Sequence, residues 1–240
     1  MNPLCSIIIP AYNEAEWLPE TLKCLGKAID DFGQPAEVIV VDNNSTDETA
    51  EIARSHGAQV VFEPVNQISR ARNTGARTAS GNYFVFLDAD TLLPENLFRA
   101  AINRLNGGGC CGGGARVALY EAVPSFVRTG LSFWNYWSAT AGIAAGCFIF
   151  CLKRGFESVG GFSEQVYAGE EYWLSRRLKF WGKRNGMTFE IIDEPPIITS
   201  SRKLRWFSPL QMISILLVGA FPLSARSRSL CAFWYKRPKI

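Results

Sequence analysis

The chain has 240 residues, of which 48% are hydrophobic and 20% are charged, and this composition excludes an intrinsically disordered protein. The length suffices for one large α/β domain. The net charge is only +3, but residues 195–240 contain eight Lys or Arg and no Asp or Glu, which leaves 17 basic and 22 acidic residues elsewhere. A basic tail behind an acidic body indicates an anionic partner for the tail, such as a phosphate group or a membrane surface.

In chain order, short runs rich in β-branched or aromatic residues predict strands at 6–10, 37–41, 59–62 and 83–87. The segments around them have helical spacing or helix-start residues, which predicts helices over 13–28, 48–55 and 68–79 and a further helix that opens at Pro94. Strands and helices that alternate in this way predict a mostly parallel sheet covered by helices. Ligands of such sheets bind beyond the carboxyl ends of the strands, so the polar residues that follow each strand should converge there.

The glycine-rich segment 106–114 is not followed by Lys-Ser or Lys-Thr, so it is not a P-loop. A flexible turn, or an edge where another backbone approaches closely, is the preferred interpretation. Residues 129–152 carry no charge. A helix rich in aromatic residues, followed by a buried strand near 145–151, fits this stretch better than a membrane-spanning helix, which stays the alternative.

Residues 209–221 form a second apolar segment. Thirteen helical residues extend only about 20 Å, which is too short to cross a hydrocarbon core of about 30 Å. Two interpretations remain: a helix docked on the domain, or a helix that lies on a membrane surface with the basic, aromatic end of the chain at the headgroups. The seven cysteines have no metal-site spacing and predict buried, reduced thiols.

Asp88 and Asp90 follow the strand at 83–87. Side chains two residues apart on an extended strand point the same way, so both carboxylates could face one ligand. Hard oxygen donors at this place suit Mg²⁺ or Mn²⁺, which take one or two carboxylates together with substrate phosphates. The alternative is a helix N-terminus that carries acidic residues because its dipole favours them.

Four blocks of the sequence, in this order, resemble one large family: CSIIIPAYNEAEWLPETL, EVIVVDNNSTDET, SRARNTGARTASGNYFVFLDAD, and VGGFSE with AGEEYWLSRRL. They are similar to the inverting nucleotide-sugar glycosyltransferases of GT-A fold, the family 2 group that includes cellulose- and chitin-synthase-like enzymes. The resemblance covers roughly residues 4 to 185. It implies an α/β, Rossmann-like, mostly parallel sheet with flanking helices, followed here by a C-terminal amphipathic helical tail.

The resemblance also implies roles for single residues. The nucleotide-sugar-binding positions that it implies are Pro10, Ala11, Tyr12, Glu14, Asp42, Asn44, Arg72, Asp88 and Asp90. Asp42 would accept a hydrogen bond from the base, and Arg72 would face the nucleotide-sugar. Asp88 would lie near the ribose, and Asp90 would bind the metal that bridges the diphosphate.

Glu171 matches the family's general base, with Glu170 beside it. A sugar hydroxyl is a poor nucleophile, so a carboxylate must take its proton as it attacks the anomeric carbon. Attack opposite the leaving diphosphate inverts that carbon, and the base must therefore lie across the sugar from the metal. The alternative is that both glutamates are ordinary first-turn acids of a helix.

Four departures from the family pattern matter. The acid pair is more often Glu-Asp, so whether Glu170 or Glu171 is the base stays open. Trp173 stands where many relatives have Asp, and it is either a platform for a sugar ring or part of the core. A histidine that a relative has near the diphosphate has no counterpart in this chain. The candidates for its role are Ser200, Ser201, Arg202 and Lys203. The Gln-x-x-Arg-Trp motif of processive synthases is absent, which favours transfer of a single sugar.

The sequence thus predicts a glycosyltransferase domain at 1–200 and a basic, apolar tail at 201–240. The expected reaction moves one sugar from a UDP- or GDP-sugar to an acceptor hydroxyl, with Mg²⁺ or Mn²⁺ and no nucleic-acid partner. A sugar-1-phosphate nucleotidyltransferase and a catalytically silent, membrane-surface module that binds nucleotide-sugar are the alternatives. Because the chain starts without a signal sequence, we expect a cytoplasmic protein, with peripheral binding to the inner face of the membrane left open.

Overall fold

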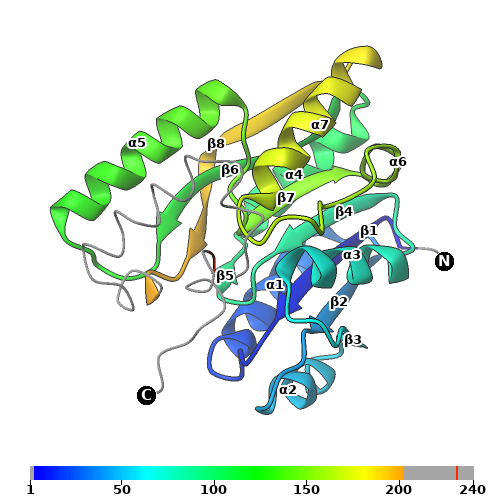
Figure 1. Cartoon of the computed structure of the whole chain (residues 1–240), viewed down its shortest axis with the longest axis vertical. Helices are drawn as coiled ribbons and strands as arrows, with labels where there is room; N and C mark the ends of the chain where they lie inside the picture. Colours follow the sequence, from blue (N-terminus) through cyan, green and yellow to red (C-terminus); the bar gives the residue numbers. More distant parts are fainter. Residues whose placement is uncertain (1–2, 203–230, 232–240) are drawn as a thin grey trace.

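The computed structural model describes residues 3–202 and residue 231 (Figure 1). Its strands are β1 (Cys5–Ala11), β2 (Ala36–Asp42), β3 (Gln59–Phe62), β4 (Tyr83–Leu87), β5 (Thr91–Leu92), β6 (Cys110–Leu119), β7 (Phe148–Leu152) and β8 (Thr188–Thr199). Its helices are α1 (Leu18–Phe32), α2 (Thr49–Ser55), α3 (Ile68–Thr78), α4 (Glu95–Asn106), α5 (Ser125–Ala141), α6 (Lys153–Ser158) and α7 (Glu170–Arg184). In the described part of the chain the strands form one sheet of order β3-β2-β1-β4-β7-β6-β8-β5.

The first half of the sheet is parallel, as predicted. β3, β2, β1 and β4 lie side by side and run in one direction, with Ile8 paired to Ile39 on one side and to Phe86 on the other. β7 and β5 run antiparallel to their neighbours, whereas β8 runs parallel to β6. The sheet is therefore mixed beyond β4, and its parallel half brings the carboxyl ends of β1, β2 and β4 to one edge.

Alternate side chains of the central strands enter two separate cores. Ile7 and Ile9 of β1 pack on one face of the sheet with residues of α1 and α4. Ile8 packs on the other face with Phe86 of β4 and with residues of α3, α6 and α7, including Leu174. Both faces of the parallel strands are thus covered, which explains why β1 and β2 are continuously apolar rather than alternating in polarity.

The glycine-rich segment differs from its predicted form. The turn is confined to its first residues, and residues from Cys110 onward form β6, which lies inside the sheet between β7 and β8. The predicted close backbone approach is present, because a Cβ on Gly112 would lie 2.7 Å from the carbonyl oxygen of Phe150. Glycine is weakly represented in strands, so the local sequence did not indicate a strand at the centre of a sheet.

Several other elements differ from the prediction, among them α1 and β8, and neither β5 nor α6 was predicted. The first helix begins at Leu18 rather than at residue 13, because Asn13 is in the left-handed region (φ 53°) and Pro19 occupies the first turn, where proline is tolerated. β8, the twelve-residue strand Thr188–Thr199, was not predicted at all. The predicted aromatic helix and the strand after it are confirmed as α5 and β7.

No helix within residues 3–202 is long and apolar enough to cross a membrane. The predicted apolar helix at 209–221 and most of the basic tail lie outside the described residues. The structure describes all seven cysteines: Cys24 and Cys147 are half-buried, the other five are buried, and none is paired in a disulfide.

Candidate functional site

The loops that follow β1 and β2 are tied to each other at the carboxyl edge of the sheet. The backbone N–H of Asn13 donates to Ser45 Oγ at 3.0 Å, and the N–H of Thr46 donates to Asn13 Oδ1 at 2.7 Å. Asn13 and Asn44 have positive φ angles of 53° and 67°, which asparagine tolerates better than most residues. Asp42 accepts from the N–H of Ser45 at 2.9 Å, so its carboxylate helps to shape the second loop.

Of the other positions predicted to surround the nucleotide, Ala11 pairs with Asp42 across the two strands. Ala11 is buried, Pro10 and Tyr12 are half-buried, and Asn44 is exposed, where its amide donates to Asn66 Oδ1 at 3.0 Å. The structure thus brings these residues to one edge of the sheet, in two loops that share hydrogen bonds.

Arg72 of α3 lies among a second group of predicted site residues, which are Asp88, Glu170 and Glu171, and its side chain is buried, with 1% exposed. Its Nη1 donates to Glu170 Oε1 at 2.7 Å, and its Nη2 donates to Asp88 Oδ1 at 2.9 Å. The same Nη2 donates to the carbonyl oxygen of Gly146 at 2.7 Å, and the guanidinium lies 5.1 Å from the ring centroid of Phe162. One buried cation therefore joins α3, the end of β4, the loop before β7 and the first turn of α7.

Glu171 faces a cavity of about 250 Å³ together with Arg72, Asp88 and Glu170. Burial is the main reason why the pKa of Glu171 is raised to about 8, and the negative charges of Glu170 and Asp88 raise it further, against the opposing effect of Arg72. The two glutamates are thus distinguished by their surroundings. Glu170 forms an ion pair with Arg72, whereas Glu171 has a raised pKa, so its deprotonated form is a stronger proton acceptor than an ordinary carboxylate.

Asp90 has a different partner from Asp88. Its Oδ2 lies 2.8 Å from Nε of Arg202, whose Nη2 donates to Glu14 Oε1 at 2.6 Å. All three side chains are buried, and the guanidinium lies 5.8 Å from the ring centroid of Trp17. The N–H of Ser200 donates to the backbone carbonyl of Asp90 at 3.2 Å, which places the end of β8 against the second aspartate.

The two aspartates therefore hold different arginines, although both follow the same strand. Asp88 and Glu171 share the cavity at Arg72, whereas Asp90 lines a second cavity of about 360 Å³ with Trp17, Tyr120 and other residues. Asp42 lines neither of these two cavities.

Two contacts of the site were not predicted. Ser200, Ser201, Arg202 and Lys203 were candidates near the diphosphate, but the sequence did not indicate that Arg202 pairs with Glu14, 188 residues earlier. The carbonyl oxygen of Gly146 was also missed, since a backbone acceptor leaves no mark in the side-chain pattern.

The donor set is compatible with a divalent cation that takes most of its ligands from a substrate. The described residues contain no group of three or more His, Cys, Asp or Glu that could hold a metal by themselves. Asp88 and Asp90 offer carboxylate oxygens just after the end of β4, and each of them already forms an ion pair with an arginine. One or two carboxylates completed by phosphate oxygens is the usual arrangement for Mg²⁺.

Comparison with known proteins places the chain in a family. Glycosyltransferase AglE of Haloferax volcanii is 30% identical over 196 residues, which cover 72% of this chain and 61% of that protein. The structure of the mannosyltransferase PcManGT from Pyrobaculum calidifontis, in complex with GDP-Man and Mn²⁺, superposes with a TM-score of 0.64 at 20% identity, covering 98% of this chain and 69% of that one. TarS 1-349 of S. aureus, in complex with UDP-GlcNAc, gives 0.63 at 16% identity and covers 98% and 72%.

The chain spans between 22% and 61% of the length of the first curated relatives that it matches. The structural neighbours share its GT-A fold, an α/β architecture with a curled mixed sheet and flanking helices. The model of the family described as glycosyl transferase family 2 matches residues 6–143, which is more than half of the chain. The chain therefore belongs to glycosyl transferase family 2.

Proposed function

We propose that the protein is an inverting glycosyltransferase that moves one sugar from a UDP- or GDP-sugar to an acceptor hydroxyl. The observation that carries this proposal is the cavity shared by Asp88, Arg72 and Glu171, in which a carboxylate with a raised pKa faces an arginine and an aspartate. Membership of the family supports the reaction class, and the GDP-Man and UDP-GlcNAc bound to structural neighbours support the class of donor.

In the proposed reaction, Glu171 accepts the proton of the acceptor hydroxyl as its oxygen bonds to the anomeric carbon. The bond from that carbon to the diphosphate breaks on the opposite side, and the nucleoside diphosphate leaves with the electron pair. Arg72 forms ion pairs with Glu170 and Asp88, and these pairs hold in place two of the residues that line the cavity with Glu171. The loops after β1 and β2, with Asp42, Tyr12 and Asn44, are proposed to hold the base and ribose.

We propose that Asp90, with Asp88, holds Mg²⁺ or Mn²⁺, as the Mn²⁺ of the mannosyltransferase neighbour suggests. The metal, when bound, would neutralise the negative charge that grows on the diphosphate. Arg202 is proposed to contribute positive charge at the same place, since it contacts Asp90 and is fixed by Glu14. The acceptor is proposed to be a glycan or a lipid-linked sugar, and the basic tail to bind an anionic membrane surface.

The test is release of nucleoside diphosphate from a panel of UDP- and GDP-sugars, with and without Mn²⁺. We expect one donor class to release UDP or GDP with Mn²⁺, and Asp90→Asn to lower the rate at least 100-fold, because it removes the charge that holds the cation. Asp31→Asn is the matched control, since within residues 3–202 Asp31 forms its one ion pair with Arg99, on the surface. Full activity of Asp90→Asn with Mn²⁺ would contradict the metal assignment, and a lack of release from every donor would contradict the enzyme proposal.

A further inference from the structure

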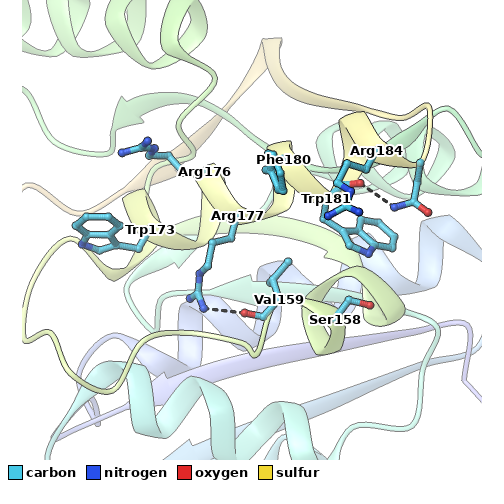
Figure 2. Close-up of a pocket in the computed structure, with 9 residues that line it drawn as sticks. Ser158, Val159, Trp173, Arg176, Arg177, Phe180, Trp181 and Arg184 are labelled. Atoms are coloured by element: carbon cyan, nitrogen blue, oxygen red, sulfur yellow. Dashed lines mark hydrogen bonds between the residues drawn. The ribbon is translucent and has the colours of Figure 1, made fainter.

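A groove of about 810 Å³ runs along α7, next to the end of α6 (Figure 2). Its floor and one wall come from one face of the helix, because the residues are three or four positions apart. These residues are Trp173, Arg176, Arg177, Phe180, Trp181 and Arg184. Ser158 and Val159 form the opposite wall. None of the residues that line the groove is acidic.

Arg177 carries a partly buried charge that no acid neutralises. Its Nη1 donates to the carbonyl oxygen of Val159 at 2.7 Å (Figure 2). Its Nη2 donates to the carbonyl oxygen of Gly161 at 2.5 Å. Its Nε is buried and has no hydrogen-bond partner among the described residues, and burial lowers the pKa of the guanidinium. Within residues 3–202 no carboxylate lies within 4.0 Å of Arg177, unlike Arg72 and Arg202, which each have two.

The remaining arginines of this face lie over aromatic rings, and apart from a hydrogen bond of 3.3 Å from Arg176 Nη1 to Tyr172 Oη, their donors face outward. Arg176 lies 5.6 Å from the ring centroid of Tyr172, and Arg184 lies 5.7 Å from that of Phe180. Neither of them has an ion pair with an acid in the described part of the chain. Phe180 is 65% exposed, so the groove offers a wide apolar face between positive charges.

We infer that this groove binds an acidic saccharide, which is the acceptor or part of it; the identification as acceptor rests on the proposed glycosyltransferase function. Planar guanidinium groups bind carboxylate or phosphate in a bidentate manner. The apolar faces of sugar rings pack on exposed aromatic side chains. This combination of arginines and aromatic rings therefore matches a saccharide that carries carboxylate or phosphate groups.

The position of the groove agrees with this assignment. Trp173, at the start of the groove, and Glu171 both lie in the first turn of α7. Side chains two positions apart point to different sides of a helix, so the groove and the cavity of the proposed base lie on different sides of the N-terminal end of α7. From Trp173 to Arg184 the helix rises about 17 Å, enough for more than one sugar ring. The groove suits an extended chain better than a flat membrane surface, and an acceptor would have to extend around the N-terminal end of α7 to bring a hydroxyl to Glu171.

The experiment measures binding to the full-length protein without donor, by titration calorimetry, of tetragalacturonic acid and of neutral maltotetraose of the same length. Mannose 6-phosphate tests phosphate in place of carboxylate. We expect the acidic tetrasaccharide to bind at least tenfold more tightly than the neutral one. We expect Arg176→Gln with Arg184→Gln, both exposed positions, to abolish at least nine tenths of that affinity.

The matched control is Arg77→Gln with Arg128→Gln, which removes the same charge from exposed arginines of α3 and α5. The inference is overturned if the control lowers the affinity as much as the groove variant does, or if neither acidic sugar binds at millimolar concentration. It is also overturned if single-stranded oligonucleotide or anionic vesicles bind more tightly and with the same dependence on Arg176 and Arg184. Donor hydrolysis is measured separately, so a protein that binds acidic saccharide but releases no nucleotide refutes the proposed function and leaves the groove assignment standing.

Discussion

Arg72 and Glu171 show how strongly single side chains in this site depend on buried charge. Arg72 is held by carboxylates from two distant parts of the chain, and removing one partner of such a buried pair costs about 3–5 kcal/mol. Glu171 differs from Arg72 because burial and its acidic neighbours disfavour its charged form. Below its pKa of about 8, Glu171 is mostly protonated and cannot accept a proton.

This gives a prediction for the pH dependence of sugar transfer. Because only the deprotonated form of Glu171 accepts a proton, kcat/KM should rise with pH and level off above about 8. Glu170→Gln removes a negative neighbour that raises this pKa, so the midpoint should move to lower pH. Rates measured from pH 5.5 to 9.5 test this, with the exposed Glu51→Gln as control. A midpoint that stays in place in Glu170→Gln, or a pH-dependent limb that survives in Glu171→Gln, would show that another group is titrating.

The sequence left open which of the two glutamates is the base, and the reason is physical. Both occupy the first turn of α7, and what separates them is the contact between Glu170 and Arg72, 98 residues earlier. No local pattern encodes such a contact. Asp88 and Asp90 were likewise expected to face one ligand, yet their partners come from α3 and from the end of β8, a strand that was not predicted.

At the scale of elements, β6 shows what glycine does inside a sheet. Gly112 and Gly113 lie where β7 and β8 press most closely on β6. A Cβ on Gly113 would meet the carbonyl oxygen of Glu190 and would lie 2.7 Å from Cζ of Phe150. These two residues belong to the two neighbouring strands, so β6 would have to move away from both of them.

We therefore expect Gly113→Ala to lower the free energy of unfolding by about 1–3 kcal/mol, the usual effect of overpacking a core. The matched control is Gly130→Ala in α5, where nothing lies within 4 Å of the added Cβ, and helix propensity should raise the free energy of unfolding by up to about 1 kcal/mol. Urea unfolding followed by circular dichroism measures both changes. Equal stability of Gly113→Ala and the wild type would mean that the strands are less tightly packed than described.

Elements with strong local patterns were predictable, and elements placed by distant packing were not. β3 and β4 have the bounds that the sequence predicted, because each is a short apolar run between turn residues. β6 and β8 take their form from each other: they pair in parallel over most of their length, although they lie 69 residues apart at closest. A window of a few residues contains no record of that pairing.

At the scale of the whole molecule, charge separates the chain into an acidic body and a basic end. Residues 195–240 contain all of the positive excess, and the rest of the chain has a net charge of −5. Arg202, the first cation of this end, is buried against Glu14 and Asp90. The other seven basic residues lie outside the described residues. The prediction that they bind an anionic membrane surface rests on the sequence.

We expect the full-length protein to bind vesicles that contain phosphatidylglycerol, and to bind less as salt rises. Replacing Lys236, Arg237 and Lys239 by Gln should weaken binding about 100-fold, at roughly 1 kcal/mol for each basic residue near an anionic surface. The control replaces Lys23, Lys27 and Arg54, three exposed basic residues of the body. Vesicle co-sedimentation measures both variants, and equal binding to phosphatidylcholine alone would refute the electrostatic interpretation.

The hydrogen bonds between the loops after β1 and β2 have a consequence for recognition. Asn13 both donates to and accepts from the second loop, and the N–H of Glu14 donates to Thr49 Oγ1 at 2.7 Å, so each loop is fixed by the other. Their conformational entropy is given up when the chain folds, before any ligand arrives. A nucleotide that binds between them, as proposed, would meet loops whose backbone is already fixed, and its affinity would not be reduced by the entropy cost of ordering that backbone.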